Sequence, residues 1–217
     1  MRILFAMLGA LTLSACAFGD EKLTLAYAPE APQVGVISEA PQTDLTIATV
    51  TDARPDRKPV GKDETADPKR PFLLAYKRNG FGQKTGNVVG VEPAVDTVKA
   101  AIEQMLAENG HAVVDNAGEG GLTIAVKDLW LEVKPGAFTV EFSGNAAADI
   151  ELVDARTGEV VFSDSFTGFY SSRAAGGLSG TWTKILNAAV ADLVRNISLS
   201  TELKEALDQL EANGATS

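Results

Sequence analysis

The side chains that most often carry catalysis are scarce in this chain. Its 217 residues include one histidine, His111, and one cysteine, Cys16. The usual histidine-and-cysteine zinc sites and a disulfide within the chain both need more of these residues, so the sequence excludes them. His111 follows Asn109-Gly110, a pair typical of a helix end, and no serine or cysteine motif accompanies it. We therefore expect a structural histidine, no catalytic residue, no metal site and no cofactor.

Carboxylates are concentrated in one charged stretch, where they alternate with basic residues: Asp52, Arg54, Asp56, Arg57, Lys58, Lys62, Asp63, Glu64 and Asp67. Paired carboxylates can bind Ca²⁺ or hydrolyse a glycan, but the spacing of a calcium loop is missing, and alternating charges suit a solvated loop. Asp52 and Arg54 lie nearest the preceding strand, where loops often carry binding residues. They are our candidates in this stretch for contact with a partner.

A second segment, residues 80–86, is rich in glycine and superficially resembles a phosphate-binding loop. It lacks the full Walker spacing, and no helix begins directly after it. We interpret it as the tip of a hairpin.

Aromatic residues supply the remaining candidates for binding. Phe169, Tyr170 and Arg173 precede a glycine-rich stretch, and aromatic residues with arginine are typical of protein interfaces. The alternative is a strand end whose aromatic residues complete the core. Trp130 has the opposite parity to its apolar neighbours Leu129 and Leu131, which predicts that it faces solvent or a partner.

The first sixteen residues have the pattern of a secretory signal. Arg2 precedes an apolar run from Ile3 to Leu13, far shorter than the roughly 20 residues that span a bilayer. Leu13-Ser14-Ala15-Cys16 is similar to the lipobox of bacterial lipoproteins. The resemblance implies cleavage before Cys16, a diacylglycerol group on its thiol, and an acyl chain such as palmitate on the new amino terminus. Ala17 replaces the aspartate of the inner-membrane retention signal, which implies the outer membrane.

The chain divides into a signal peptide at residues 1–15, a tether, one domain and a tail. Pro29, Pro32 and Pro41 disfavour helix and central strand, so residues 16–43 are predicted to form an extended, lipid-anchored stalk that lies along or above the domain. Residues 44–210 carry the regular hydrophobic patterns and are predicted to form a single periplasmic domain. Residues 211–217 are predicted to be a frayed tail.

Hydrophobic periodicity predicts the elements of the domain. Apolar residues have helical spacing over 93–109, 182–197 and 201–210. Strands are predicted over 44–50, 72–76, 87–91, 111–114, 122–133, 138–152 and 160–170, with a hairpin turn at 156–159. The alternation changes phase across Lys127-Asp128, which predicts a bulge. The result is an α+β, two-layer domain in which two long helices pack on one face of a mixed or antiparallel sheet.

This order of elements resembles the YajG-type bacterial envelope lipoproteins. The resemblance covers the lipobox cysteine, the first strand with its charged loop, the helix-Gly-strand unit, the long hairpin and the terminal helices. The chain departs from the pattern between Pro68 and Asn87, where it is longer and richer in glycine. The resemblance implies a domain that is anchored to the outer membrane and faces the periplasm, and it implies little about chemistry.

Charge limits the partners of such a domain. The net charge of −10 argues against nucleic acid, and it predicts no attraction to anionic lipid headgroups beyond the acyl anchor on Cys16. We predict a non-enzymatic binding or assembly module whose partner is an envelope protein, peptidoglycan or lipid. The alternatives are an auxiliary lipoprotein of an envelope transport system, or a hydrolase of the cell wall or of glycans that uses loop carboxylates.

Overall fold

The computed structural model describes most of the chain after the predicted signal. The described residues are 19–29, 31–57, 70–79, 81–115, 118–135, 139–174 and 179–214. The signal peptide, Cys16 and residues 58–69 of the charged loop lie outside these ranges.

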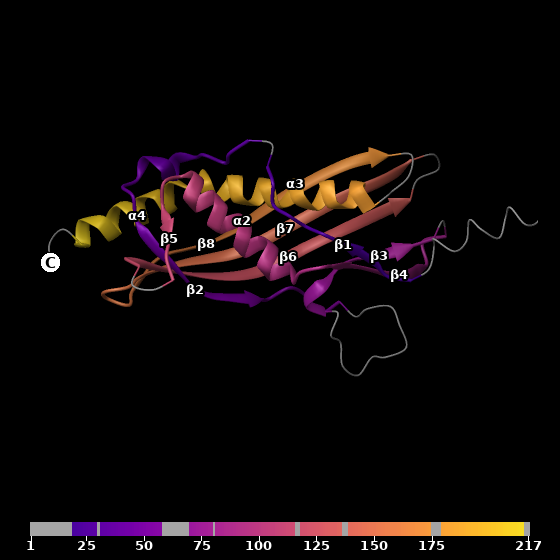
Figure 1. Ribbon diagram of the computed structural model, residues 1–217, viewed down its shortest axis with the longest axis horizontal. Coiled ribbons are helices and arrows are strands. Elements are labelled where there is room, and N and C mark those ends of the chain that lie inside the picture. Colours follow the sequence, from indigo (N-terminus) through magenta and orange to yellow (C-terminus); the bar gives the residue numbers. More distant parts are fainter. Residues whose placement is uncertain are drawn as a thin grey trace, which may run out of the picture.

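A long mixed sheet forms the main layer (Figure 1). Its strand order is β5-β2-β6-β7-β8. The strands are β2 (Asp44–Asp52), β5 (Ala112–Val113), β6 (Gly120–Pro135), β7 (Val140–Asp154) and β8 (Val160–Ala174). Strand β2 runs parallel to β5 and β6, whereas β6, β7 and β8 are antiparallel. The prediction of a mixed sheet is confirmed.

A smaller sheet of order β1-β4-β3 lies at one end of the molecule. It consists of β1 (Glu21–Leu23), β3 (Leu73–Arg78) and β4 (Lys84–Gly90). Strands β3 and β4 form an antiparallel hairpin, and β1 pairs with β4 in parallel. The segment that departs from the YajG pattern therefore builds this second sheet together with the start of the described chain.

Helices α2 (Ala94–Glu108) and α3 (Ser179–Ser198) lie over one face of the long sheet, and α4 (Thr201–Gly214) continues from α3 at the opposite end from β1. The predicted helical periods are confirmed. All eight apolar positions that define the pattern in α3 are buried: Trp182, Ile185, Leu186, Ala189, Val190, Leu193, Val194 and Ile197.

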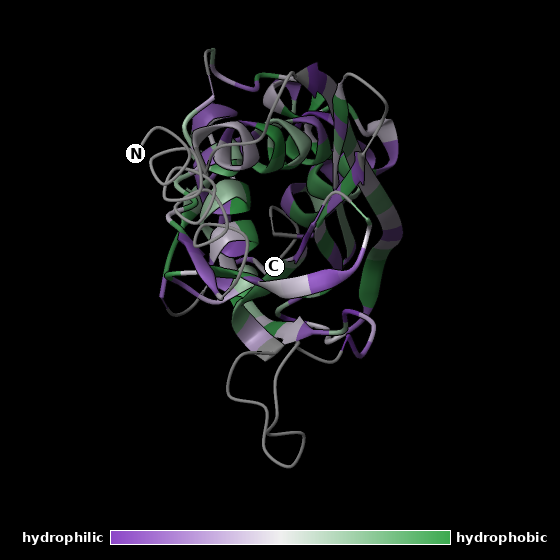
Figure 2. Ribbon diagram, turned by 90° about the vertical axis from the view of Figure 1, so that its right-hand side faces the viewer, coloured by the Kyte–Doolittle hydropathy of each residue, from purple (hydrophilic) through white to green (hydrophobic). Residues whose placement is uncertain are grey.

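The strand patterns also hold. The register between β6 and β7 shifts between Val126 and Asp128, which confirms the predicted bulge. Residues of even number in β7, from Phe142 to Leu152, are buried beneath the helices, and successive hydrophobic and hydrophilic blocks along the strands are visible in Figure 2. The turn between β7 and β8 has Gly158 at a φ of 74°, as its sequence predicts.

Helix α3 approaches the sheet unusually closely at two glycines, Gly144 on β7 and Gly168 on β8. A Cβ atom on Gly144 would lie 2.9 Å from the carbonyl oxygen of Ile185. A Cβ atom on Gly168 would overlap the backbone of Ala189 and Leu193. Only glycine leaves room for the helix backbone at these positions.

The described part of the predicted stalk lies along the domain and, in addition, contributes side chains to its core. The described part of residues 16–43 packs on the domain, with Leu23 and Ile37 fully buried in the core. The amide of Asn109 fixes this segment because its Oδ1 accepts from the backbone N–H of Gly35 at 2.8 Å and its Nδ2 donates to the carbonyl of Gln33 at 2.8 Å. The prolines predicted an extended chain, but they carry no information about what that chain packs against.

The predicted tail also begins too early, because α4 continues to Gly214. The carbonyl of Asn213 accepts from Arg156 Nη1 at 2.9 Å, and the Asn213 amide donates to Asp154 at 3.3 Å. These bonds tie the end of α4 to the turn between β7 and β8. Hydrogen bonds from the backbone and side chain of Arg156 lower the pKa of Asp154 below its usual range, so this carboxylate stays charged.

We expect Gly168→Ala to destabilise the domain by about 1–3 kcal/mol, because the added methyl group forces α3 away from β8. Urea unfolding followed by circular dichroism measures the change. Gly180→Ala is the matched control, since a Cβ atom there meets no atom within 4 Å and alanine favours a helix. Equal unfolding midpoints for Gly168→Ala and the unmodified protein would contradict the close approach.

Candidate functional site

Two of the predicted contact residues share the face of the long sheet that the helices leave uncovered. Trp130 on β6 pairs with Asn145 on β7, which in turn pairs with Phe169 on β8. The three side chains therefore form one row across three strands, with Trp130 and Phe169 about 10 Å apart. Phe169 is 56% exposed, and Trp130 is half-buried. We call this side of β6, β7 and β8 the outer face.

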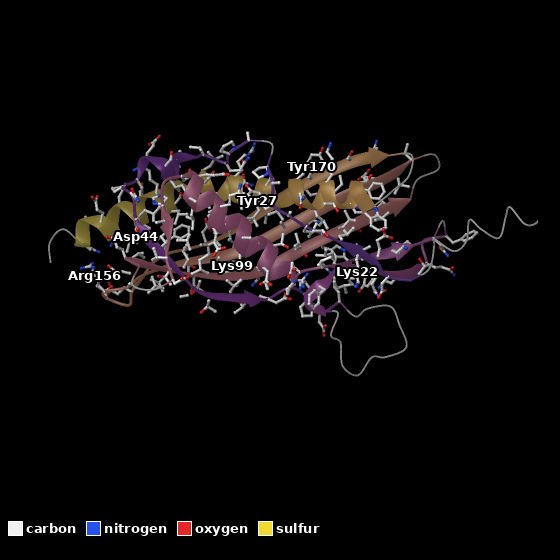
Figure 3. All side chains as sticks on the ribbon, in the orientation of Figure 1. Lys22, Tyr27, Asp44, Lys99, Arg156 and Tyr170 are labelled. Carbon is white, nitrogen blue, oxygen red and sulfur yellow. The ribbon has the colours of Figure 1, made fainter. Side chains whose placement is uncertain are left out.

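Arg173 lies on the outer face as well, two residues beyond Ser171 on β8. Its side chain is 74% exposed, and its guanidinium lies 3.1 Å from the carboxylate of Glu141 on β7. Tyr170 has the other parity, since it pairs with Gly144, and it points to the side that α3 covers (Figure 3). Phe169 and Arg173 thus lie together on the outer face, whereas Tyr170 does not join them.

Trp130 is surrounded by groups from two other segments. The ring of Tyr76 on β3 meets it edge-on with 5.0 Å between centroids, and the guanidinium carbon of Arg57 lies 4.1 Å from the Trp130 ring centroid. Arg57 also donates to Asp128 at 2.9 Å, which holds it over the ring. A guanidinium on an aromatic face is attracted by the ring quadrupole, so the cluster has a fixed geometry.

An open cavity of about 180 Å³ lies beside this cluster and is lined by Arg57, Tyr76, Arg78, Trp130, Leu131, Glu132 and Val133. It presents two guanidinium groups, two aromatic rings and one carboxylate. Glycoside hydrolysis requires a pair of carboxylates about 5–9.5 Å apart, and this cavity offers only Glu132. The lining instead has the chemistry of a binding surface.

Asp52 and Arg54 lie next to Trp130, but they serve the fold. Arg54 is 7% exposed and forms two hydrogen bonds of 2.9 Å with the carboxylate of Asp52. It also donates to the carbonyls of Leu73 at 2.9 Å and Pro71 at 3.0 Å. The Arg54 guanidinium therefore fastens the start of β3 to the end of β2, and this places Tyr76 over Trp130.

His111 is buried, and its Nε2 lies 3.0 Å from the carbonyl oxygen of Ile37. This contact agrees with a structural role, since it holds the docked N-terminal segment near the end of α2. Within the described ranges, no group of three or more His, Cys, Asp or Glu side chains is arranged to hold a metal ion.

Sequence reasoning missed Arg57, Tyr76, Arg78 and Glu132 as members of the cavity. The parity of Trp130 predicted the face of the strand on which its side chain lies. No sequence pattern indicated that a second sheet would bring Tyr76 and Arg78 beside it. Glu132 shares the parity of Trp130 on the same strand, which was the one signal available in the sequence.

We expect Arg54→Met to destabilise the domain by roughly 3 kcal/mol, because it removes the guanidinium that donates to Asp52 and to two backbone carbonyls. Arg173→Met is the control, since an exposed ion pair contributes about 0–1 kcal/mol. Equilibrium unfolding of the two variants gives the comparison. Similar stabilities would show that Arg54 does not fasten the two strands.

Comparison with known proteins agrees with the fold. A crystal structure from Xanthomonas campestris, assigned to the family DUF330, superposes with a TM-score of 0.56 at 13% identity and covers 87% of this chain and 98% of that one. At this identity, the likeness shows the fold alone. No curated protein matches the sequence at a significant level.

Two solved lipoproteins are less similar in structure, with TM-scores too low to support an argument. A minor lipoprotein from Acinetobacter baumannii has 12% identity, coverage of 54% of this chain and 87% of that one, and a TM-score of 0.38. A lipoprotein from Neisseria meningitidis has 16% identity, coverage of 72% and 99%, and a TM-score of 0.34.

A family model described as "uncharacterized lipoprotein" matches residues 65–208, well over half of the chain. It corresponds to the family that the order of elements resembles. Neither α3, the longest described helix, nor any other described helix has the length and hydrophobicity of a membrane-crossing segment. The chain therefore belongs to the YajG family of lipoproteins, whose name implies attachment to the cell envelope through a lipid.

Proposed function

We propose that this chain is a non-enzymatic binding or assembly module, held at the outer membrane by acyl chains on Cys16, whose outer face binds an envelope protein in the periplasm. Membership of a lipoprotein family supports the anchor, as does the lipobox-like sequence that ends at the only cysteine. Several acyl chains give stable attachment, whereas one alone binds a membrane only marginally.

The row of Trp130, Asn145 and Phe169 is the observation that carries the proposed partner site. An exposed phenylalanine in one row with a half-buried tryptophan, and an arginine four residues further along β8, are typical of the aromatic and arginine anchors at protein interfaces. Trp130, Phe169 and Arg173 belong to strands that are already paired in the sheet. Binding therefore orders little additional backbone, which lowers its entropic cost.

The side chains between the anchors are small or polar. Ser143, Asn145 and Ala147 occupy the outer face of β7, and Asn145 lies between Trp130 on β6 and Phe169 on β8. A partner could therefore approach the central strand closely while it contacts aromatic rings on both sides. Confinement to a membrane raises the effective concentration of a partner in the same membrane, so modest affinity is sufficient for association.

A photo-crosslinking amino acid at position 171 should capture a discrete partner in cells. Ser171 lies on the outer face between Phe169 and Arg173, and Ser163 lies on the same face of the same strand, about 27 Å away. We expect one defined product from position 171 and much less from position 163, measured by immunoblotting and identified by mass spectrometry.

Phe169→Ser should weaken this capture about tenfold, which corresponds to a loss of roughly 1.4 kcal/mol of binding free energy from one interface anchor. Because the Phe169 side chain is exposed, we expect the domain of this variant to remain folded, and its thermal melting curve checks this directly. Equal capture from positions 171 and 163, or no effect of Phe169→Ser, would count against the outer face as the partner site.

Cys16→Ser should abolish acylation and release the protein from membranes, because the acyl chains supply the stable attachment. Metabolic labelling with a fatty acid and fractionation of inner and outer membranes measure both effects. Sedimentation of the serine variant with membranes at the level of the unmodified protein would contradict the anchor.

A further inference from the structure

The tip of the β3–β4 hairpin displays a phenylalanine to solvent. Phe81 is 92% exposed, the highest value among the exposed large hydrophobic residues of the described chain. The Asn79 carboxamide oxygen accepts from the backbone N–H groups of Phe81 and Gln83, each at 3.0 Å. Arg78 Nη1 donates to the carbonyl of Gly82 at 2.7 Å. These bonds hold the backbone at residues 81–83, from which the exposed ring projects.

Basic residues predominate in the small sheet, and two of them, Arg78 and Lys84, form the pair next to the tip. Lys22, Lys77, Arg78 and Lys84 lie in the three strands of the small sheet, and these strands contain a single acidic residue, Glu21. At the other end of the molecule, α4 contains four acidic residues and one lysine. Figure 3 labels Lys22 in the region of the small sheet and Arg156 at the opposite end of the molecule. The chain is acidic overall, but the three strands of the small sheet together carry positive charge.

The same end receives the start of the described chain. The backbone N–H of Gly19 donates to the carbonyl of Thr85 at 3.2 Å, next to Lys84 on β4. Cys16 precedes Gly19 by three residues, which span at most about 11 Å even when fully extended. Acyl chains on Cys16 would therefore enter the bilayer beside the small sheet, and the hairpin would be held at the membrane surface.

From this geometry, and resting on the lipid anchor proposed above, we propose that the β3–β4 hairpin is a second membrane contact, in which Phe81 inserts into the interfacial region of an anionic bilayer. Phenylalanine is one of the residues that bury their side chains at the boundary between headgroups and acyl chains. Arg78 and Lys84 flank the tip at the ends of β3 and β4, where they can meet anionic headgroups around the inserted ring. The two contacts together fix the orientation of the domain, which one acylated residue could not do.

Position-specific fluorescence in lipid vesicles tests this contact. The acylated full chain carrying Phe81→Cys has one reactive thiol, because Cys16, its only other cysteine, is blocked by the acyl group. A nitrobenzoxadiazole probe at position 81 should shift its emission to the blue in vesicles of phosphatidylethanolamine and phosphatidylglycerol, and brominated acyl chains should quench it. The control is Val160→Cys, since Val160 is 57% exposed and follows the turn at the far end of the molecule.

The outcomes separate the contact from the anchor. A blue-shifted, quenched probe at position 81 with an unshifted probe at position 160 supports the proposal. If the acylated protein floats with the vesicles while the position-81 probe stays in water, the hairpin contact is overturned and the anchor stands. Insertion of both probes overturns a defined orientation, and absence of acyl chains on Cys16 overturns anchor and contact together. A position-81 probe protected only when a partner protein is added would assign the tip to that protein and overturn the lipid contact.

Discussion

The close approach of α3 to β7 and β8 is the constraint on which the rest of the structure depends. With glycine at positions 144 and 168, the helix backbone comes near enough to the sheet to bury its whole apolar stripe. The same approach covers the free edge of β8, since Asp192 accepts from the backbone N–H of Phe169 at 3.1 Å and Asn196 donates to the carbonyl of Thr167 at 2.8 Å. An uncovered edge strand invites pairing with other chains, so α3 protects β8 where its outer face carries Phe169.

This arrangement divides the two faces of the long sheet between structure and binding. The inner face is filled by α2, α3 and the docked N-terminal segment, which places Leu23 and Ile37 in the same core as the helices. The outer face remains available, and Trp130 and Phe169 align on it because the bulge between Val126 and Asp128 resets the register of β6 against β7. A strand without that bulge would turn Trp130 inward and Leu129 outward, because a slip of one residue moves every side chain to the other face.

The sequence predicted those helices and strands whose apolar residues repeat with a strong period. It did not predict contacts that depend on a single residue. Eight apolar positions define α3, and a change of phase marks the bulge, so local pattern alone located both. Ile37 is one apolar residue in a proline-rich stretch, and no period shows that it enters the core. Arg54 belongs to a run of alternating charges typical of a solvated loop, and its burial depends on the carbonyls of Pro71 and Leu73, which are distant in sequence.

The candidate site was predicted only in part, because it too depends on contacts between distant segments. The parity of Trp130 gives the face on which its side chain lies, but it does not indicate the second sheet that brings Tyr76 to it.

Net charge was the sequence property that argued most directly against contact with anionic lipid, and the structure shows why an average is a poor guide here. Strand β7 runs along the long axis, and its 15 residues span about 50 Å. Charges in solution are screened over about 8–10 Å at physiological ionic strength. A bilayer beside the hairpin tip would therefore respond to Arg78 and Lys84 and hardly at all to the acidic residues of α4. If the hairpin end rests on the membrane, the long strands project away from it, and the outer face is presented sideways to proteins held in the same membrane.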